Sequence, residues 1–225
     1  MKNKLYSKYS CPRRLASSKK IPIALFISLV TVGVTAAYLT YHTLIINLIR
    51  VGSNTISIAE DFEPPKKQSV GDNVFKKKVQ IENVDDTDSF IRVFMDFSDS
   101  SIKALSKISP SGNDWYDASE YMSSDFSNFP ENWVYISEAD DALLGGYYYY
   151  TVPVKAKEMT TPLVERIMIT YTDASQIRDF DILVTADSIQ TYVNEENEDG
   201  SLTAKDVSEE TNGWKMAWTE YMKRR

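Results

Sequence analysis

The stretch FIRVFMDF, residues 90–97, places an apolar side chain at every second position. A period of two is the signature of a β-strand that buries one face. Its inward set is Ile91, Val93, Met95 and Phe97. The same alternation occurs in two other segments, at Phe75, Val79 and Ile81, and at Leu163, Ile167, Ile169 and Tyr171. Further strands are predicted where β-branched and aromatic residues gather, over 54–58, 133–137, 147–154 and 180–186.

Turn-forming residues separate these strands and point to an all-β domain over 54–225. The turn signals are Pro64-Pro65, Gly71-Asp72, the polar run 83–88, Gly145-Gly146 and the run 172–175. Many short strands at this spacing predict a two-sheet β-sandwich. The long polar stretch 98–132 is predicted as an insertion that is helical or a large loop, and the acidic stretch 194–211 as a second insertion.

The C-terminal tail has the spacing of an amphipathic helix. Trp214, Ala217, Trp218 and Tyr221 recur at helical intervals after Asn212. A helix that caps one end of the sandwich is the favoured interpretation, and a helix that binds a partner is the alternative.

Charge is distributed unevenly along the chain. The first twenty residues carry seven Lys or Arg and no acidic residue, which leaves 18 basic and 32 acidic residues downstream, a net charge of -14. Such a domain would repel nucleic-acid phosphates, so nucleic-acid binding is excluded.

The single cysteine, Cys11, lies in the basic segment, so the rest of the chain forms no disulfide.

The basic N-terminus leads into an uncharged apolar run, IPIALFISLVTVGVTAAY, over 21–38. A basic region, an apolar region and small residues at its exit are the parts of a signal peptide, so 1–37 is predicted to be a leader that enters the membrane through 21–38. Cleavage after Ala36 or Ala37 is expected. The alternative is an uncleaved transmembrane anchor, lengthened by the second apolar run 44–49. The domain is therefore expected outside the cytoplasm in either case.

Catalytic motifs are missing from the sequence, and no enzyme, metal or cofactor is predicted. The chain has one histidine, His42, whereas a zinc protease motif needs two histidines and a glutamate. The acidic pairs Asp85-Asp86, Asp140-Asp141 and Glu195-Glu196 are interpreted as solvated surface. The acidic runs 83–88 and 194–199 offer oxygen ligands but match no calcium-loop motif.

Four consecutive tyrosines, residues 147–150, could present a stacking platform for carbohydrate. The favoured interpretation is a central strand with two rings in the core and two near the surface.

A series of short motifs resembles the TasA/camelysin-like family of Firmicutes, exported through a SipW-type signal peptidase. The motifs are, in order, TAAYLT (35–40), VGSN (51–54), ISIAEDFEPP (56–65), FKK (75–77), VQIEN (79–83), FIRV (90–93), YYYY (147–150), TTPL (160–163), IQT (189–191) and AW (217–218). One departure is Tyr41, where the family commonly has aspartate. The resemblance covers most of the chain after the leader.

The resemblance implies a jelly-roll-like sandwich that is secreted or associated with the Gram-positive cell wall. It also implies a noncatalytic matrix subunit that self-assembles, or joins other matrix proteins, by adding an extended N-terminal segment to a neighbour's sheet. The segment 38–53 would supply that strand, with candidate donor residues Leu44, Ile45, Ile46, Leu48, Ile49 and Val51. Two alternatives stay open: a camelysin-like, membrane-associated metallopeptidase, and a carbohydrate-binding or adhesive module.

Overall fold

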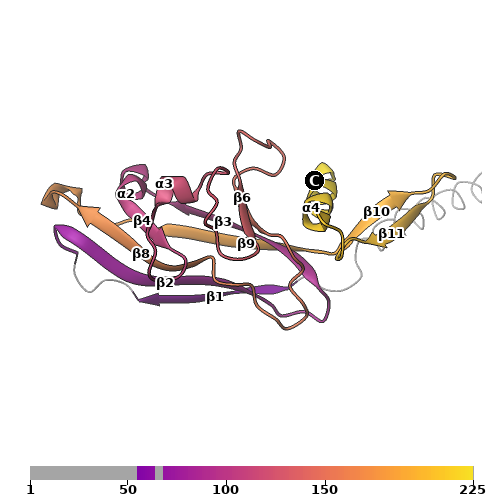
Figure 1. The fold of residues 1–225 in the computed structure, drawn as a ribbon, viewed down its shortest axis with the longest axis horizontal. Helices are drawn as coiled ribbons and strands as arrows, with labels where there is room; N and C mark the ends of the chain where they lie inside the picture. The colour runs from indigo at the N-terminus through magenta and orange to yellow at the C-terminus, as the bar shows by residue number, and fades with distance from the viewer. Residues whose placement is uncertain (1–54, 64–67, 225) are drawn as a thin grey trace, which may run out of the picture. The chain divides into compact units, whose positions relative to one another are not determined.

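The computed structural model describes residues 55–63 and 68–224. Contacts divide the chain into two units, 1–45 and 46–225, and all described residues belong to the second. Figure 1 shows its elements, which are β1 (Ile56–Glu63), β2 (Gly71–Asn83), β3 (Ser89–Phe97), α2 (Ser100–Ala104), β4 (Ser106–Ser109), β5 (Tyr116–Asp117), α3 (Ala118–Tyr121), β6 (Trp133–Ile136), β7 (Tyr147–Tyr150), β8 (Val164–Tyr171), the 3₁₀ turn η1 (Ala174–Gln176), β9 (Ile182–Gln190), β10 (Tyr192–Glu196), β11 (Leu202–Asp206) and α4 (Gly213–Lys223).

Two antiparallel sheets form the sandwich. The first, sheet A, has the order β1-β2-β8-β4-β5, and the second, sheet B, has the order β6-β7-β3-β9. The chain crosses repeatedly between the sheets, since β2, β4, β5 and β8 lie in sheet A while β3, β6, β7 and β9 lie in sheet B. The predicted jelly-roll-like two-sheet sandwich is confirmed for the described part of the chain.

The main core lies between the two sheets and is built from the residues that alternate in the sequence. Phe75, Val79 and Ile81 face inward from β2. The predicted inward sets of β3 and β8 also belong to this core, as does Leu163 just before β8. Alternation therefore identified the buried faces correctly, because each of these strands has one face toward the opposite sheet.

Several strand boundaries differ from the expectation. β1 continues to Glu63 and β9 to Gln190, beyond the predicted ends at 58 and 186. Gly71 begins β2 instead of forming a turn before it, because β8 continues to Tyr171 and pairs with Gly71. The glycine accommodates this start with a φ of 102°, a conformation that other residues rarely adopt. β7 ends at Tyr150, short of the predicted 154, since Pro153 has no backbone N–H to give to a sheet.

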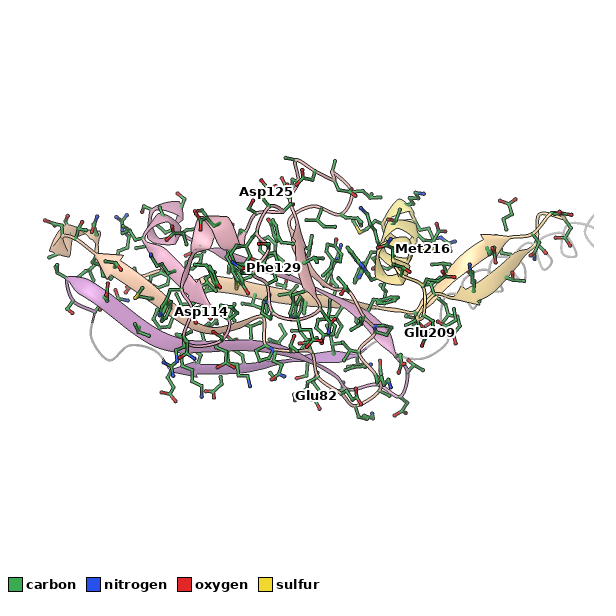
Figure 2. All side chains as sticks on the ribbon, viewed as in Figure 1. Glu82, Asp114, Asp125, Phe129, Glu209 and Met216 are labelled. Carbon is green, nitrogen blue, oxygen red and sulfur yellow. The ribbon has the colours of Figure 1, made fainter. Side chains whose placement is uncertain are left out.

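The stretch 98–132 contains the expected helical turns, α2 and α3, and it also contributes to sheet A. β4 pairs with β8 on one side and with β5 on the other. Aromatic side chains from the rest of this stretch pack on the core, and Phe129, labelled in Figure 2, lies 5.9 Å from the ring of Tyr148. The stretch is therefore integrated into the sandwich.

The predicted C-terminal helix is confirmed as α4, which packs on the outer face of sheet B. Its buried residues are Gly213, Trp214, Ala217 and Trp218. They join a second apolar cluster, called here the outer cluster, which also contains Phe90, Leu144, Tyr149, Ile189 and Val207. The acidic stretch 194–211 holds most of a β-hairpin, β10–β11, and β10 contacts α4.

Candidate strand-addition site

Two long strand edges lie side by side at one side of the sandwich. Within the described residues, β1 pairs only with β2, and β9 pairs only with β3. β1 and β9 also contact each other, although they belong to different sheets. We call this pair of neighbouring edges the seam. The opposite edges are shorter, since β5 has 2 residues and β6 has 4, whereas β1 has 8 and β9 has 9.

The hydrogen-bond phase of each edge strand determines which backbone groups face the seam. Ser98 donates its N–H to the carbonyl of Asp181 at 2.9 Å, which places the odd-numbered residues of β9 in bonding contact with β3. The N–H and C=O groups of Ile182, Val184 and Ala186 therefore point outward. The hydrogen bond from the Val84 N–H to the Thr55 carbonyl, 3.2 Å, likewise places the odd-numbered residues of β1 in bonding contact with β2. The backbone groups of Ile56 and Ile58 therefore point outward.

The same positions also direct their side chains between the sheets. Ile182, Val184 and Ala186 pack against the main core while keeping part of their surface exposed. Ile56 and Ile58 do the same from β1. The seam therefore offers backbone groups that pair with no residue in the described part of the chain, together with partly exposed apolar side chains at alternate residues, which is the arrangement that an added strand can use.

A cavity of about 450 Å³ lies at the end of the seam where β9 begins. Its lining includes Phe62, Phe75 and Phe180, together with Lys77. Lys77 points inward from β2 and is only 7% exposed. Its ammonium group forms an ion pair with Glu60 and lies 5.0 Å from the centroid of the Phe62 ring. Burial lowers the pKa of Lys77 below its ordinary value, because desolvation disfavours the charged form.

An inward-pointing charge beside an open strand edge has a recognised physical effect. It opposes indiscriminate pairing with any passing strand, since the incoming chain must accommodate the charge. The seam therefore has two parts. Lys77 makes one end polar, and Ile182, Val184 and Ala186 form the apolar part.

The predicted cleavage residues Ala36 and Ala37 lie outside the described residues. The same holds for the donor candidates Leu44, Ile45, Ile46, Leu48, Ile49 and Val51, for the membrane segment 21–38 and for His42. The seam itself was not predicted as a site. Its strands were predicted in part from their β-branched and aromatic composition, but the position of a strand at a sheet edge has no signal in its own sequence.

The four tyrosines of β7 are central, because β7 lies between β6 and β3. Tyr148 and Tyr150 face the main core, and Tyr149 faces the outer cluster with Tyr147 packed beside it. Tyr148 and Tyr149 are both 0% exposed, so neither ring is offered to solvent. The central-strand interpretation holds. Tyr147 keeps part of its surface exposed, as the sequence interpretation expected, whereas Trp214 and Trp218 of α4 cover the ring of Tyr149.

The hydroxyl groups of the buried tyrosines are paired with carbonyl groups. Tyr148 donates to the carbonyl of Tyr121 at 3.1 Å, and Tyr149 donates to that of Leu144 at 2.6 Å. Tyr121 donates in turn to Leu163 at 2.5 Å. Burial raises the pKa of Tyr149 to about 12 and raises those of Tyr121 and Tyr148 further.

The acidic pairs lie in surface loops and on the hairpin. Asp86 forms an ion pair with Lys157 at 3.0 Å, and Asp140 accepts a hydrogen bond from the Ser137 hydroxyl at 2.5 Å. Asp85 is the exception to the solvated interpretation, since it is 7% exposed and accepts the backbone N–H of Thr55. Among the residues that the structure describes, no three His, Cys, Asp or Glu side chains gather as metal ligands.

Within 55–63 and 68–224, no helix combines the length and the apolar character needed to cross a bilayer. Comparisons with known proteins give no match to this chain among protein-family models, curated proteins or solved structures.

Proposed function

We propose that this chain is an exported, noncatalytic cell-surface or extracellular-matrix protein whose sandwich accepts a strand at the seam. The observation that carries the proposal is that the outward backbone groups of Ile182, Val184 and Ala186 pair with nothing within 55–63 and 68–224, while their apolar side chains stay partly exposed. The basic leader and the apolar run 21–38 support export, by a SipW-type signal peptidase in the family that the sequence resembles.

The segment 43–51 has the composition of a strand that fits the seam. Leu44, Ile46 and Leu48 share one parity, so an extended segment would present all three to the same side. Each buried Leu or Ile contributes about 1.5–3 kcal/mol, whereas a typical hydrogen bond contributes about 0.5–1.5 kcal/mol net. Side-chain burial therefore dominates the free energy of strand addition, and the seam's apolar residues are the determinants to test.

The first experiment compares two purified forms, one that begins at residue 38 and one that begins at residue 52. We expect the longer form to assemble into fibres that are visible by electron microscopy and detected by light scattering. The shorter form should remain monomeric because it lacks the donor segment. Two monomeric forms, or two assembling ones, would contradict strand donation by 38–51.

A matched pair of substitutions tests the seam. Val184→Lys places a charge between the sheets at the seam, whereas Thr185→Lys places the same charge on the exposed face of the same strand. We expect Val184→Lys to abolish assembly and Thr185→Lys to preserve it, with both variants retaining a cooperative thermal transition. Normal assembly by Val184→Lys would exclude the seam as the acceptor.

The metallopeptidase alternative has a direct test of its own. Casein degradation by the purified protein, with and without a chelator, should show no chelator-sensitive activity.

Mass spectrometry of the N-terminus in secreted and membrane fractions tests export. Cleavage should leave Ala37 or Tyr38 as the first residue, whereas an intact N-terminus in the cytoplasm would contradict the proposal.

A further inference from the structure

A cavity of about 220 Å³ lies between α4 and the strands β9 and β10. Its apolar lining includes Ile189, Val193 and Ala217, and the small side chain of Ala217 leaves room between the helix and the strands. At about 30 Å³ per water molecule, the cavity holds roughly seven waters. Drug-sized ligands occupy pockets of about 300–1,000 Å³, so this cavity suits a single six-membered ring.

Two half-exposed tyrosines from different elements flank this cavity. Tyr192, the first residue of β10, is 46% exposed, and Tyr221 of α4 is 42% exposed. Tyr221 meets the fully buried Trp218 edge to face, with centroids 5.7 Å apart. The orientation of the Tyr221 ring is therefore supported from inside the protein. An exposed aromatic face of this kind attracts the C–H groups of a ring stacked on it.

Planar polar groups line the rest of the cavity. Arg224 donates from Nε to Glu220 at 2.9 Å. With its amide oxygen facing Arg224, Asn194 accepts from Nη1 and Nη2 at 2.6 and 2.9 Å. The amide of Gln190, 7% exposed, lies in the same lining. Amide, carboxylate and guanidinium groups together supply both donors and acceptors to a ligand with several hydroxyl groups.

The charges in this cavity select among ligand classes. Glu220 already neutralises Arg224, so neither an anion nor a cation finds an uncompensated partner there. A purely apolar ligand would remove the polar lining from water without replacing its hydrogen bonds, which is unfavourable. A neutral ring with hydroxyl groups on its edge and C–H groups on its face satisfies both kinds of lining.

We propose that this cavity binds one pyranose unit of a saccharide, with Tyr192 and Tyr221 as the stacking residues. The site goes beyond strand addition and is independent of it, since none of the cavity's lining residues belongs to the apolar part of the seam. A matrix or surface protein with such a site would bind a glycan through α4, β10 and the end of β9 while the apolar part of the seam remains available.

Saturation-transfer-difference NMR with the folded protein tests the proposal. The probes are glucose, galactose, mannose and N-acetylglucosamine, each at about 10 mM, because one-ring ligands are expected to bind weakly. At least one sugar should receive saturation from the wild-type protein. Tyr192→Ala and Tyr221→Ala should each weaken that binding at least tenfold. Phe62→Ala, which removes an aromatic ring of similar exposure (48%) from the lining of the other cavity, should leave it unchanged.

Thermal unfolding verifies that each variant is folded, and Asn194→Ala replaces any tyrosine variant that is not. The proposal is overturned if none of the four sugars receives saturation. It is equally overturned if folded variants of Tyr192, Tyr221 and Asn194 bind the sugar as the wild-type protein does.

Discussion

Arg92 places a guanidinium group in the interior of the protein, with the side chain only 1% exposed. The group lies 4.1 Å from the Tyr147 ring centroid and 4.4 Å from that of Trp218, so it is stacked between β7 and α4. Its Nε and Nη2 donate to one carboxylate oxygen of Asp187 on β9, at 3.0 and 2.8 Å. One side chain on β3 thus holds three neighbouring elements together.

The partnership with Asp187 can be tested by removing the carboxylate. Asp187→Ala leaves a buried cation without its anion, and a lost charge-assisted hydrogen bond costs about 1.5–3 kcal/mol. Because Asp187 is half exposed, the lower part of that range is expected for the free energy of unfolding in urea. Asp181→Ala, an exposed position just before the same strand, should change stability by less than about 0.5 kcal/mol. Equal effects of the two variants would show that the pair contributes no stability.

Asp99 caps the short helix α2 and gives a pH-dependent prediction. Its pKa lies below the ordinary value of 3.8 because the hydroxyl of Ser101 and the N–H groups of Ile102 and Ser101 donate to the carboxylate. A lowered folded-state pKa means that the carboxylate stabilises the fold above pH 3.8 and loses that effect as the pH falls through the folded value.

Asp99→Asn keeps a capping side chain but removes the charge. We expect its melting temperature to be lower than that of the wild type at pH 7 and to converge with it once the pH falls below the folded pKa. Asp125→Asn serves as the control, since Asp125 lies on an outer loop (Figure 2) and its carboxylate accepts no hydrogen bond from the described residues. A difference that persists undiminished in acid would show that the charge is not the cause.

At the level of elements, alternation predicted the strands whose two faces differ. β2, β3 and β8 each have one face toward the main core, so a period of two was visible in their sequences. β4 and β5 were missed because they are short and because β4, with which β5 pairs, depends on β8, about 60 residues away in the chain. The hairpin β10–β11 was missed because its polar composition resembles that of a loop.

The sequence predicted parts of both candidate sites but neither site as a whole. The strands that line the seam were predicted from their composition, and Tyr221 was predicted on the helical tail. The order of strands within each sheet, which makes β1 and β9 edges, follows from long-range pairing that no local pattern encodes. Tyr192 and Asn194 lie in the stretch next to β9, and only the fold brings them beside Tyr221 and Arg224.

Gly213 determines how closely α4 can approach the rest of the protein. A Cβ atom at this position would lie 1.8 Å from the carbonyl oxygen of Val207 and 3.4 Å from the ring of Phe90. Gly213→Ala should therefore displace the start of α4 and lower the free energy of unfolding by about 1–3 kcal/mol. Met216→Ala, on the exposed face of the same helix (Figure 2), should cost about 0.5 kcal/mol or less. Denaturant unfolding measures both, and an unaffected Gly213→Ala would contradict the close packing of α4.

For the whole molecule, stability should depend on packing and not on metal ions. Asp86 of the acidic run 83–88 is paired with Lys157, and the backbone N–H of Ser201 is bound by Asp199 of the run 194–199 at 2.9 Å. We expect neither calcium nor EDTA to change the melting temperature by more than about 1 °C, a shift well below that of a 1 kcal/mol effect in a domain of this size. A calcium-dependent rise that EDTA reverses would reveal a cation site.

Burial keeps the inner tyrosines of the folded protein protonated above the pH at which tyrosine in an unfolded chain ionises, and absorbance can record this. Tyr149 has a pKa of about 12 in the folded state, whereas tyrosine in an unfolded chain ionises near 10. A raised folded-state pKa favours the fold below pH 10 and loses that contribution as the pH rises. A spectrophotometric titration of phenolate should therefore show an early phase from surface rings, then an abrupt second phase as the sandwich opens and Tyr121, Tyr148 and Tyr149 ionise together.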